Sequence, residues 1–95
     1  MAKDIKRVEL RYNDAMAEAK NLRAVAEDLR RQRDVMEEAV RVVVGGGWTG
    51  SAATAFAQHM EEKQRRIARC AFNAELYAEG IERTAGLLRE ALNGK

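Results

Sequence analysis

Apolar or small side chains recur at alternating spacings of three and four residues along two stretches of this chain. In residues 4–44 they are Ile5, Val8, Tyr12, Ala15, Ala19, Leu22, Ala26, Leu29, Met36, Val40 and Val43. In residues 51–93 they are Ala53, Phe56, Met60, Ile67, Cys70, Ala74, Tyr77, Ile81, Thr84, Leu88 and Ala91. A mean spacing near 3.5 residues is typical of helices that pack along a left-handed seam. We therefore expect one helix over residues 4–44 and a second over residues 51–93.

A run of glycines separates the two stretches. Gly45, Gly46 and Gly47 are consecutive. Glycines in series end a helix because they have the greatest backbone freedom and accept positive φ angles. Trp48, the only tryptophan of the chain, follows directly. We expect a turn over residues 45–50.

Polar side chains stand where both helices are expected to begin. Asp4 suits the N-cap of the first helix, since a carboxylate there also complements the helix dipole. Thr49 or Ser51 suits the N-cap of the second helix. If Thr49 is the cap, Trp48 precedes it and is placed to pack on Ala53, one turn into the helix.

Folding the second stretch back on the first brings the two stripes together. When the numbers of facing residues sum to 96, large side chains mostly face small ones, as close packing requires. Arg33 and Lys63, which interrupt the stripes, then share one layer. We predict an all-α fold: one domain, residues 1–95, forming an antiparallel helix–turn–helix hairpin. The polar layer is either a solvated break in the seam or is completed by acidic groups of a partner, which would fix the register.

Several apolar side chains point away from the expected seam. Phe72 and Leu76 lie one turn apart on the second helix, and Met16 and Val25 lie on the first. A single hairpin has little interior, so its apolar area offsets little of the entropy lost in ordering two long helices. We therefore expect these four residues to belong to a dimer interface, at which two hairpins pack into a four-helix bundle.

Composition argues against several functional classes. Charged residues make up 34% of the chain, but both signs are mixed and the net charge of +2 does not argue for nucleic acid as a partner. His59 and Cys70 are eleven residues apart in sequence, about 16 Å along a helix, and cannot share a catalytic or metal site. Cys70 is expected in the seam as a small core residue. We expect no enzymatic activity, no cofactor and no metal.

Trp48-Thr49-Gly50, at the midpoint of a two-helix chain of this length, resembles the motif of the WXG family. These are the ESAT-like small proteins of type VII (ESX) secretion in Gram-positive bacteria. The resemblance covers the whole chain, including the small residues from Ser51 that lead to Phe56. It implies a homodimeric or heterodimeric four-helix bundle, exported in the folded state and targeted to a membrane ATPase of the secretion system.

The resemblance also implies a role for the turn. Trp48 would lie near the export signal of the partner and form a recognition surface with it. Gly50 would have a backbone role, since a side chain there would crowd Trp48. Alternatively, Trp48 is only a hydrophobic plug that closes the open end of the hairpin.

Neither tyrosine of this sequence forms the export signal of the family. The export signal of the family is a Tyr followed four residues later by Asp or Glu, but Tyr77 is followed at that spacing by Ile81 and Tyr12 by Met16. Either a related small helical partner supplies the signal, which favours a heterodimer, or the chain is an adaptor that escorts a larger helical substrate such as a toxin. A purely structural dimerisation hairpin is a further alternative.

The sequence also bears on localisation. No apolar run approaches the roughly 20 residues of a membrane span. The basic N-terminus leads into no apolar segment typical of a secretory signal. We therefore expect a protein that is cytoplasmic before export and then secreted, or held at the cell surface, without a signal peptide.

Overall fold

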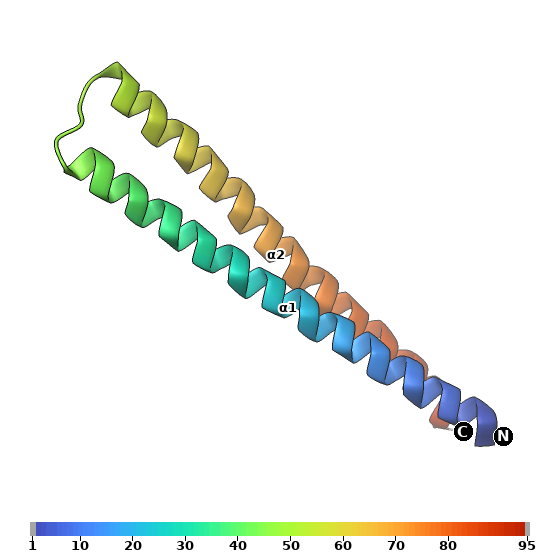
Figure 1. The fold of residues 1–95 in the computed structure, drawn as a ribbon. Helices are drawn as coiled ribbons and strands as arrows, with labels where there is room; N and C mark the ends of the chain where they lie inside the picture. Colours follow the sequence, from blue (N-terminus) through green and yellow to red (C-terminus); the bar gives the residue numbers. More distant parts are fainter. Residues whose placement is uncertain (1, 95) are drawn as a thin grey trace. The chain divides into compact units, whose positions relative to one another are not determined.

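The computed structural model describes residues 2–94, together with the side chains of residues 7, 9 and 11–94. Two helices, α1 (Ala2–Gly45) and α2 (Ser51–Asn93), make up the described chain apart from the turn and the last residue (Figure 1). The chain has no proline and is rich in residues of high helix propensity, so long uninterrupted helices form. Asp4 lies inside α1 and is not its N-cap; the side chains of Asp4, Ile5 and Val8 lie outside the described residues.

The chain divides into two compact units. The terminal unit comprises residues 1–25 and 73–95, and the turn unit comprises residues 26–72. In each unit a segment of α1 lies beside a segment of α2 that runs in the opposite direction. The predicted all-α fold of two long antiparallel helices is therefore confirmed.

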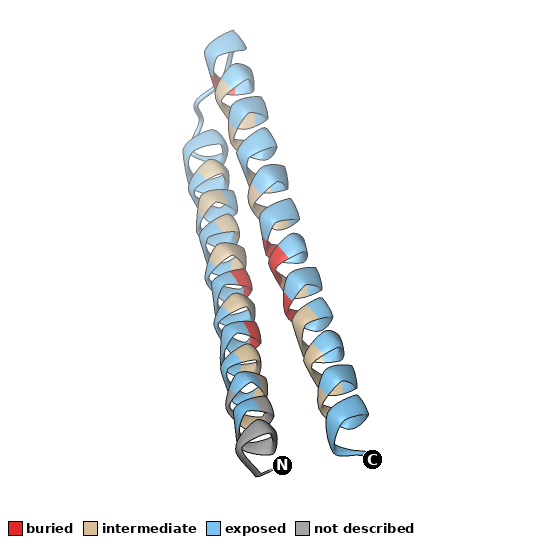
Figure 2. Ribbon diagram, turned by 90° about the vertical axis from the view of Figure 1, so that its right-hand side faces the viewer, coloured by how far each residue is buried: buried red, intermediate tan, exposed pale blue. Residues whose placement is uncertain are grey.

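Alanine forms the buried core of both units (Figure 2). The core alanines are Ala19, Ala74 and Ala78 in the terminal unit, and Ala26, Ala53 and Ala71 in the turn unit. None of the larger side chains in the described part of the chain is fully buried. Alanine combines the highest helix propensity with the smallest side chain, so it favours the helix and lets a second helix approach closely.

The buried face of α2 differs from the predicted seam. Five residues that we assigned to the seam are exposed: Cys70, Tyr77, Thr84, Leu88 and Ala91. The alanines that directly follow three of them are buried or half-buried: Ala71, Ala78 and Ala85. The prediction for these five residues is wrong, and the reason is steric. The facing helix also contributes alanine to the core, and a small residue opposite alanine lets the helices pack more closely than tyrosine or leucine would.

Candidate functional site

Glycines shape the end of α1 in the turn unit. The amide of Gly46 donates to the carbonyl oxygen of Val42 at 3.0 Å, and the amide of Gly47 donates to that of Val44 at 3.3 Å. A Cβ atom on residue 46 would lie 2.8 Å from the Val42 oxygen, closer than real Cβ atoms approach. Gly47 has a φ of 102°, in the region that other residues disfavour. The turn therefore requires glycine at both positions.

Gly50 forms the N-cap of α2. Its carbonyl oxygen accepts a hydrogen bond from the amide of Thr54 at 3.1 Å, the first bond of the helix, and another from the Thr54 hydroxyl at 3.1 Å. Its φ is 99°, which favours glycine. A Cβ atom on residue 50 would meet nothing within 4 Å, so the backbone angle, and not crowding of Trp48, explains the glycine. The prediction that Thr49 or Ser51 caps this helix is wrong.

Trp48 packs on an aromatic residue of α2. The ring centroids of Trp48 and Phe56 are 5.3 Å apart, and the ring planes are tilted by 51°. This separation lies in the range of favourable aromatic pairs. Trp48 therefore packs on Phe56, in the second turn of the helix. The contact between Trp48 and Ala53 stays a prediction. The indole is still 40% exposed, so one part of it supports the turn while the other part is available to a partner.

The residues around Trp48 form an uncharged apolar end of the turn unit. Residues 42–58 contain no Lys, Arg, Asp or Glu. Val42 is 63% exposed, and Val43 and Val44 are also exposed. A partner that covers this end would remove apolar surface from water without desolvating a charge.

The predicted polar layer separates into two different environments. Arg33 is half-buried, and its guanidinium lies 3.2 Å from the carboxylate of the neighbouring Asp34. Lys63 is exposed, and Gln64 is the half-buried residue beside it. The exposure of Lys63 agrees with the alternative of a solvated break in the seam, and its charge needs no buried carboxylate. That a partner supplies acidic groups to Arg33 stays a prediction.

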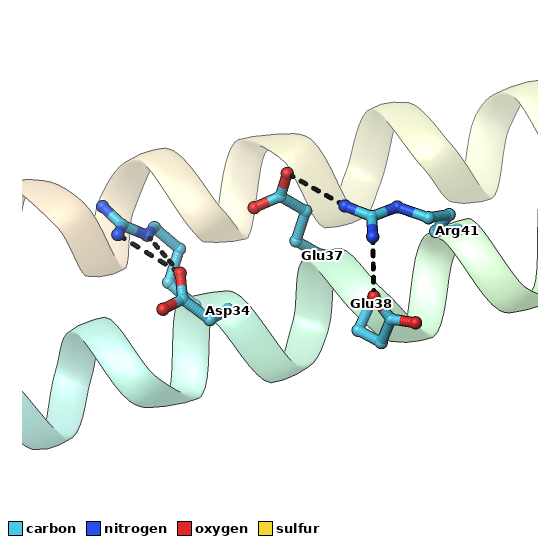
Figure 3. A network of polar contacts seen from close by, with 5 residues as sticks. Asp34, Glu37, Glu38 and Arg41 are labelled. Carbon is cyan, nitrogen blue, oxygen red and sulfur yellow. Dashed lines mark hydrogen bonds and ion pairs between the residues drawn. The ribbon is translucent and has the colours of Figure 1, made fainter.

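A short polar network follows on the same helix (Figure 3). Arg41 lies 2.9 Å from the carboxylate of Glu38 and 3.7 Å from that of Glu37, one turn earlier on α1. Exposed pairs of this kind add little to stability because water screens them. Arg41 offsets one of the two glutamate charges of α1 just before the uncharged end of the turn unit.

The four residues of the predicted dimer interface lie at the surface or near it. Phe72 is 57% exposed, and Leu76 and Val25 are each 48% exposed. Met16 is half-buried. Exposure of large apolar side chains suits a surface that a partner covers. Their role in dimerisation stays a prediction.

An apolar groove runs along the terminal unit. Its volume is about 640 Å³. The residues that line it are Arg11, Tyr12, Ala15, Leu76, Tyr77, Gly80, Ile81, Thr84, Ala85, Leu88, Arg89 and Leu92. Sequence reasoning missed this groove because it assigned Tyr77 and Leu88 to the seam. The sequence does contain a signal for the observed arrangement: a column of alanines beside that seam, which gives α2 a second face that can be buried.

Two polar clusters join α1 to α2 in the terminal unit. Arg23 is paired with Glu82 at 2.5 Å, and this hydrogen bond raises the pKa of the guanidinium and lowers that of the carboxyl. Glu9 accepts hydrogen bonds from Arg89 at 2.9 Å and from Asn93 at 3.0 Å, and its carboxylate raises the pKa of Arg89. Both pairs are partly exposed, so they add little stability and only favour this alignment of α1 and α2 within the unit.

Arg89 also contacts an aromatic ring. Its guanidinium carbon lies 4.3 Å from the centroid of the Tyr12 ring, within the range of a cation–π interaction. Because Arg89 is held on one side by Glu9 and on the other by Tyr12, its charge is already satisfied. It lines the apolar groove together with Arg11, the other cation there.

The candidate chemical residues lie apart from one another. His59 is exposed, and Cys70 is exposed as well, so the prediction of a buried Cys70 is wrong. Among the side chains that the structure describes (residues 7, 9 and 11–94), no three His, Cys, Asp or Glu are grouped so that they could hold a metal ion. Neither α1 nor α2, as described, has an apolar stretch long enough to cross a membrane.

The model of one protein family matches most of the chain. The family is described as WXG100, proteins of 100 residues with WXG, and the match covers residues 8–91. It includes most of both helices and the whole turn with Trp48 and Gly50. No curated protein and no solved structure matches the chain.

Proposed function

Because the chain belongs to the WXG100 family, we propose that it is a small helical partner or substrate of a type VII (ESX) secretion system. Proteins of this family are non-catalytic helical hairpins, and this one acts by association with other helices and by export. The observation that carries the proposal is the family match over residues 8–91, in which Trp48 and Gly50 occupy the turn.

A dimer is the proposed functional form. The exposed side chains of Phe72, Leu76 and Val25 support an interface with a second helical hairpin, since one hairpin leaves them in water. Neither Tyr12 nor Tyr77 is followed four residues later by an acidic residue. This supports a heterodimer in which the partner, a related small helical protein, carries the tyrosine-based export signal.

Trp48 is the proposed contact with the export machinery. Trp48 is 40% exposed in an uncharged apolar end of the turn unit. This exposure suits a surface that Trp48 forms together with the export signal of the partner, and that the membrane ATPase recognises. The protein is then cytoplasmic before export and secreted, or held at the cell surface, afterwards.

A second candidate function is that of an adaptor that escorts a toxin of the same secretion system. The residues that follow Tyr12 and Tyr77 favour it equally, since neither tyrosine forms the export signal and an adaptor relies on the complex for export. The two functions differ in the partner: a protein of similar size in one case, and the helical N-terminal part of a larger protein in the other.

The test combines co-purification with a secretion assay. The chain is co-expressed with the products of neighbouring genes, and the mass of each co-purifying protein is measured. Export of the chain is then followed in the native host and in a strain without the ATPase. We expect a stable complex with one small partner and ATPase-dependent export. A toxin as the partner supports the adaptor, whereas export that does not depend on the ATPase contradicts both functions.

A further inference from the structure

Asn93, the last residue of α2, is the one asparagine of the sequence that glycine follows. The other asparagines, Asn13, Asn21 and Asn73, lie inside the helices and precede Asp, Leu and Ala. The main-chain nitrogen that follows an asparagine can attack its side-chain amide, and glycine hinders this attack least because it has no Cβ atom. Asparagine is also one of the residues that degrade chemically on heating. Deamidation is therefore expected first at Asn93-Gly94.

Two hydrogen bonds hold the atoms that would react. The side-chain nitrogen of Asn93 donates to a carboxylate oxygen of Glu9 at 3.0 Å, and the Gly94 amide donates to the carbonyl oxygen of Glu90 at 2.7 Å. Asn93 and Gly94 are both exposed, and the second bond lies at the very end of α2. Bonds at an exposed helix end open at little cost in free energy. The Gly94 nitrogen can therefore reach the Asn93 side chain without unfolding of the rest of the terminal unit.

The reaction is a ring closure followed by hydrolysis. The Gly94 nitrogen loses its proton and bonds to Cγ of Asn93, while the bond between Cγ and Nδ2 breaks. The leaving nitrogen takes up the proton and departs as ammonia, so that a succinimide ring remains. One water molecule then opens this ring at either of its two C–N bonds and leaves aspartate or isoaspartate. The product carries a carboxylate where the chain had a neutral amide.

The new charge would lie beside the carboxylate of α1. Glu9 accepts hydrogen bonds from Asn93 and from Arg89 at the same oxygen. An aspartate oxygen in the place of the Asn93 nitrogen would lie 3.0 Å from that oxygen with no proton between them. A negative charge at the C-terminus of a helix also opposes the helix dipole. Deamidation therefore replaces an attraction between α1 and the end of α2 by a repulsion.

We propose that Asn93-Gly94 is a deamidation site, and that its conversion releases the last turn of α2 from α1. The conversion is covalent and runs in one direction, so it acts as a timer on this end of the terminal unit. Arg89 and Leu92, in the same turn, line the apolar groove. Their release changes the shape of the groove as the protein ages.

The first test follows the conversion in the purified full chain. The protein is incubated at neutral pH, and peptide mapping by mass spectrometry measures the change from amide to acid at each asparagine. We expect conversion of Asn93, whereas Asn73, which is also exposed but lies inside α2, stays intact. Glu9→Ala frees the Asn93 amide and should speed the conversion, and Asn93→Gln should prevent it, because the longer side chain must close a larger ring. Conversion of Asn73 as fast as that of Asn93, or of neither, overturns the proposal.

The second test measures the release of α2. Asn93→Asp carries the charge of the product, and Asn73→Asp is the matched control, because it adds the same charge at another exposed position of α2. In variants that circular dichroism shows to be helical, hydrogen exchange over residues 89–93 should be faster with Asn93→Asp and unchanged with Asn73→Asp. Glu9→Gln combined with Asn93→Asp should restore slow exchange, since the new amide can donate to the new carboxylate. Equal exchange in the two single variants overturns the proposal.

Discussion

Gly45, Gly46 and Gly47 are the same type of residue, but each has different surroundings in the turn unit. A Cβ atom would be free at Gly45, would collide with the carbonyl oxygen of Val42 at Gly46, and would be strained by the positive φ at Gly47. The sequence predicts that the helix ends here, because three glycines weaken it. It cannot predict which glycine is required, since that depends on φ and on the position of one carbonyl.

We therefore predict a graded response to alanine at these three positions. Gly46→Ala and Gly47→Ala should each destabilise the hairpin by about 1 kcal/mol or more, because one brings a steric clash and the other backbone strain. That cost corresponds to a melting temperature lower by about 4–8 °C, measured by circular dichroism. Gly45→Ala is the matched control and should leave the melting temperature equal or slightly higher. An equal loss in all three variants would contradict the turn geometry.

The sequence predicts less well how a helix is rotated about its axis than where it begins and ends. The apolar pattern of α2 includes two adjacent columns, one with Tyr77 and Leu88 and one with Ala71 and Ala78. Both columns have helical spacing, so periodicity alone does not choose between them. The choice depends on the facing helix, whose buried residues are alanines. Close packing of alanine on alanine leaves the larger column outside, where it lines the apolar groove.

A pair of substitutions on α2 tests this rotation. Ala78→Leu should lower the stability of the hairpin by about 1–3 kcal/mol, because a larger side chain overpacks a fully buried position. Tyr77→Ala should change it by less than about 0.5 kcal/mol, because the side chain is 68% exposed. Thermal unfolding of the two variants measures both effects. A larger loss for Tyr77→Ala than for Ala78→Leu would restore the seam predicted from the apolar pattern.

At the scale of the whole molecule, the sequence alone predicts the hairpin and the family resemblance. Long Pro-free helical segments, a glycine run at the midpoint and Trp48-Thr49-Gly50 are local features, which a sequence contains directly. The apolar groove, the cap at Gly50 and the contact between Trp48 and Phe56 are different. They depend on backbone angles and on which residues of two segments meet, so a one-dimensional pattern does not specify them.

Export in the native host distinguishes the two roles of Trp48. Trp48→Ala removes an aromatic contact of about 0.5–1.5 kcal/mol. Phe56→Ala removes the same contact and also truncates a half-buried side chain, so it should lower the melting temperature more. If Trp48 is a recognition residue, Trp48→Ala should abolish export, while Phe56→Ala, which keeps the indole, should retain more of it. If Trp48 is only a plug, export should follow stability, and Phe56→Ala should be exported less than Trp48→Ala.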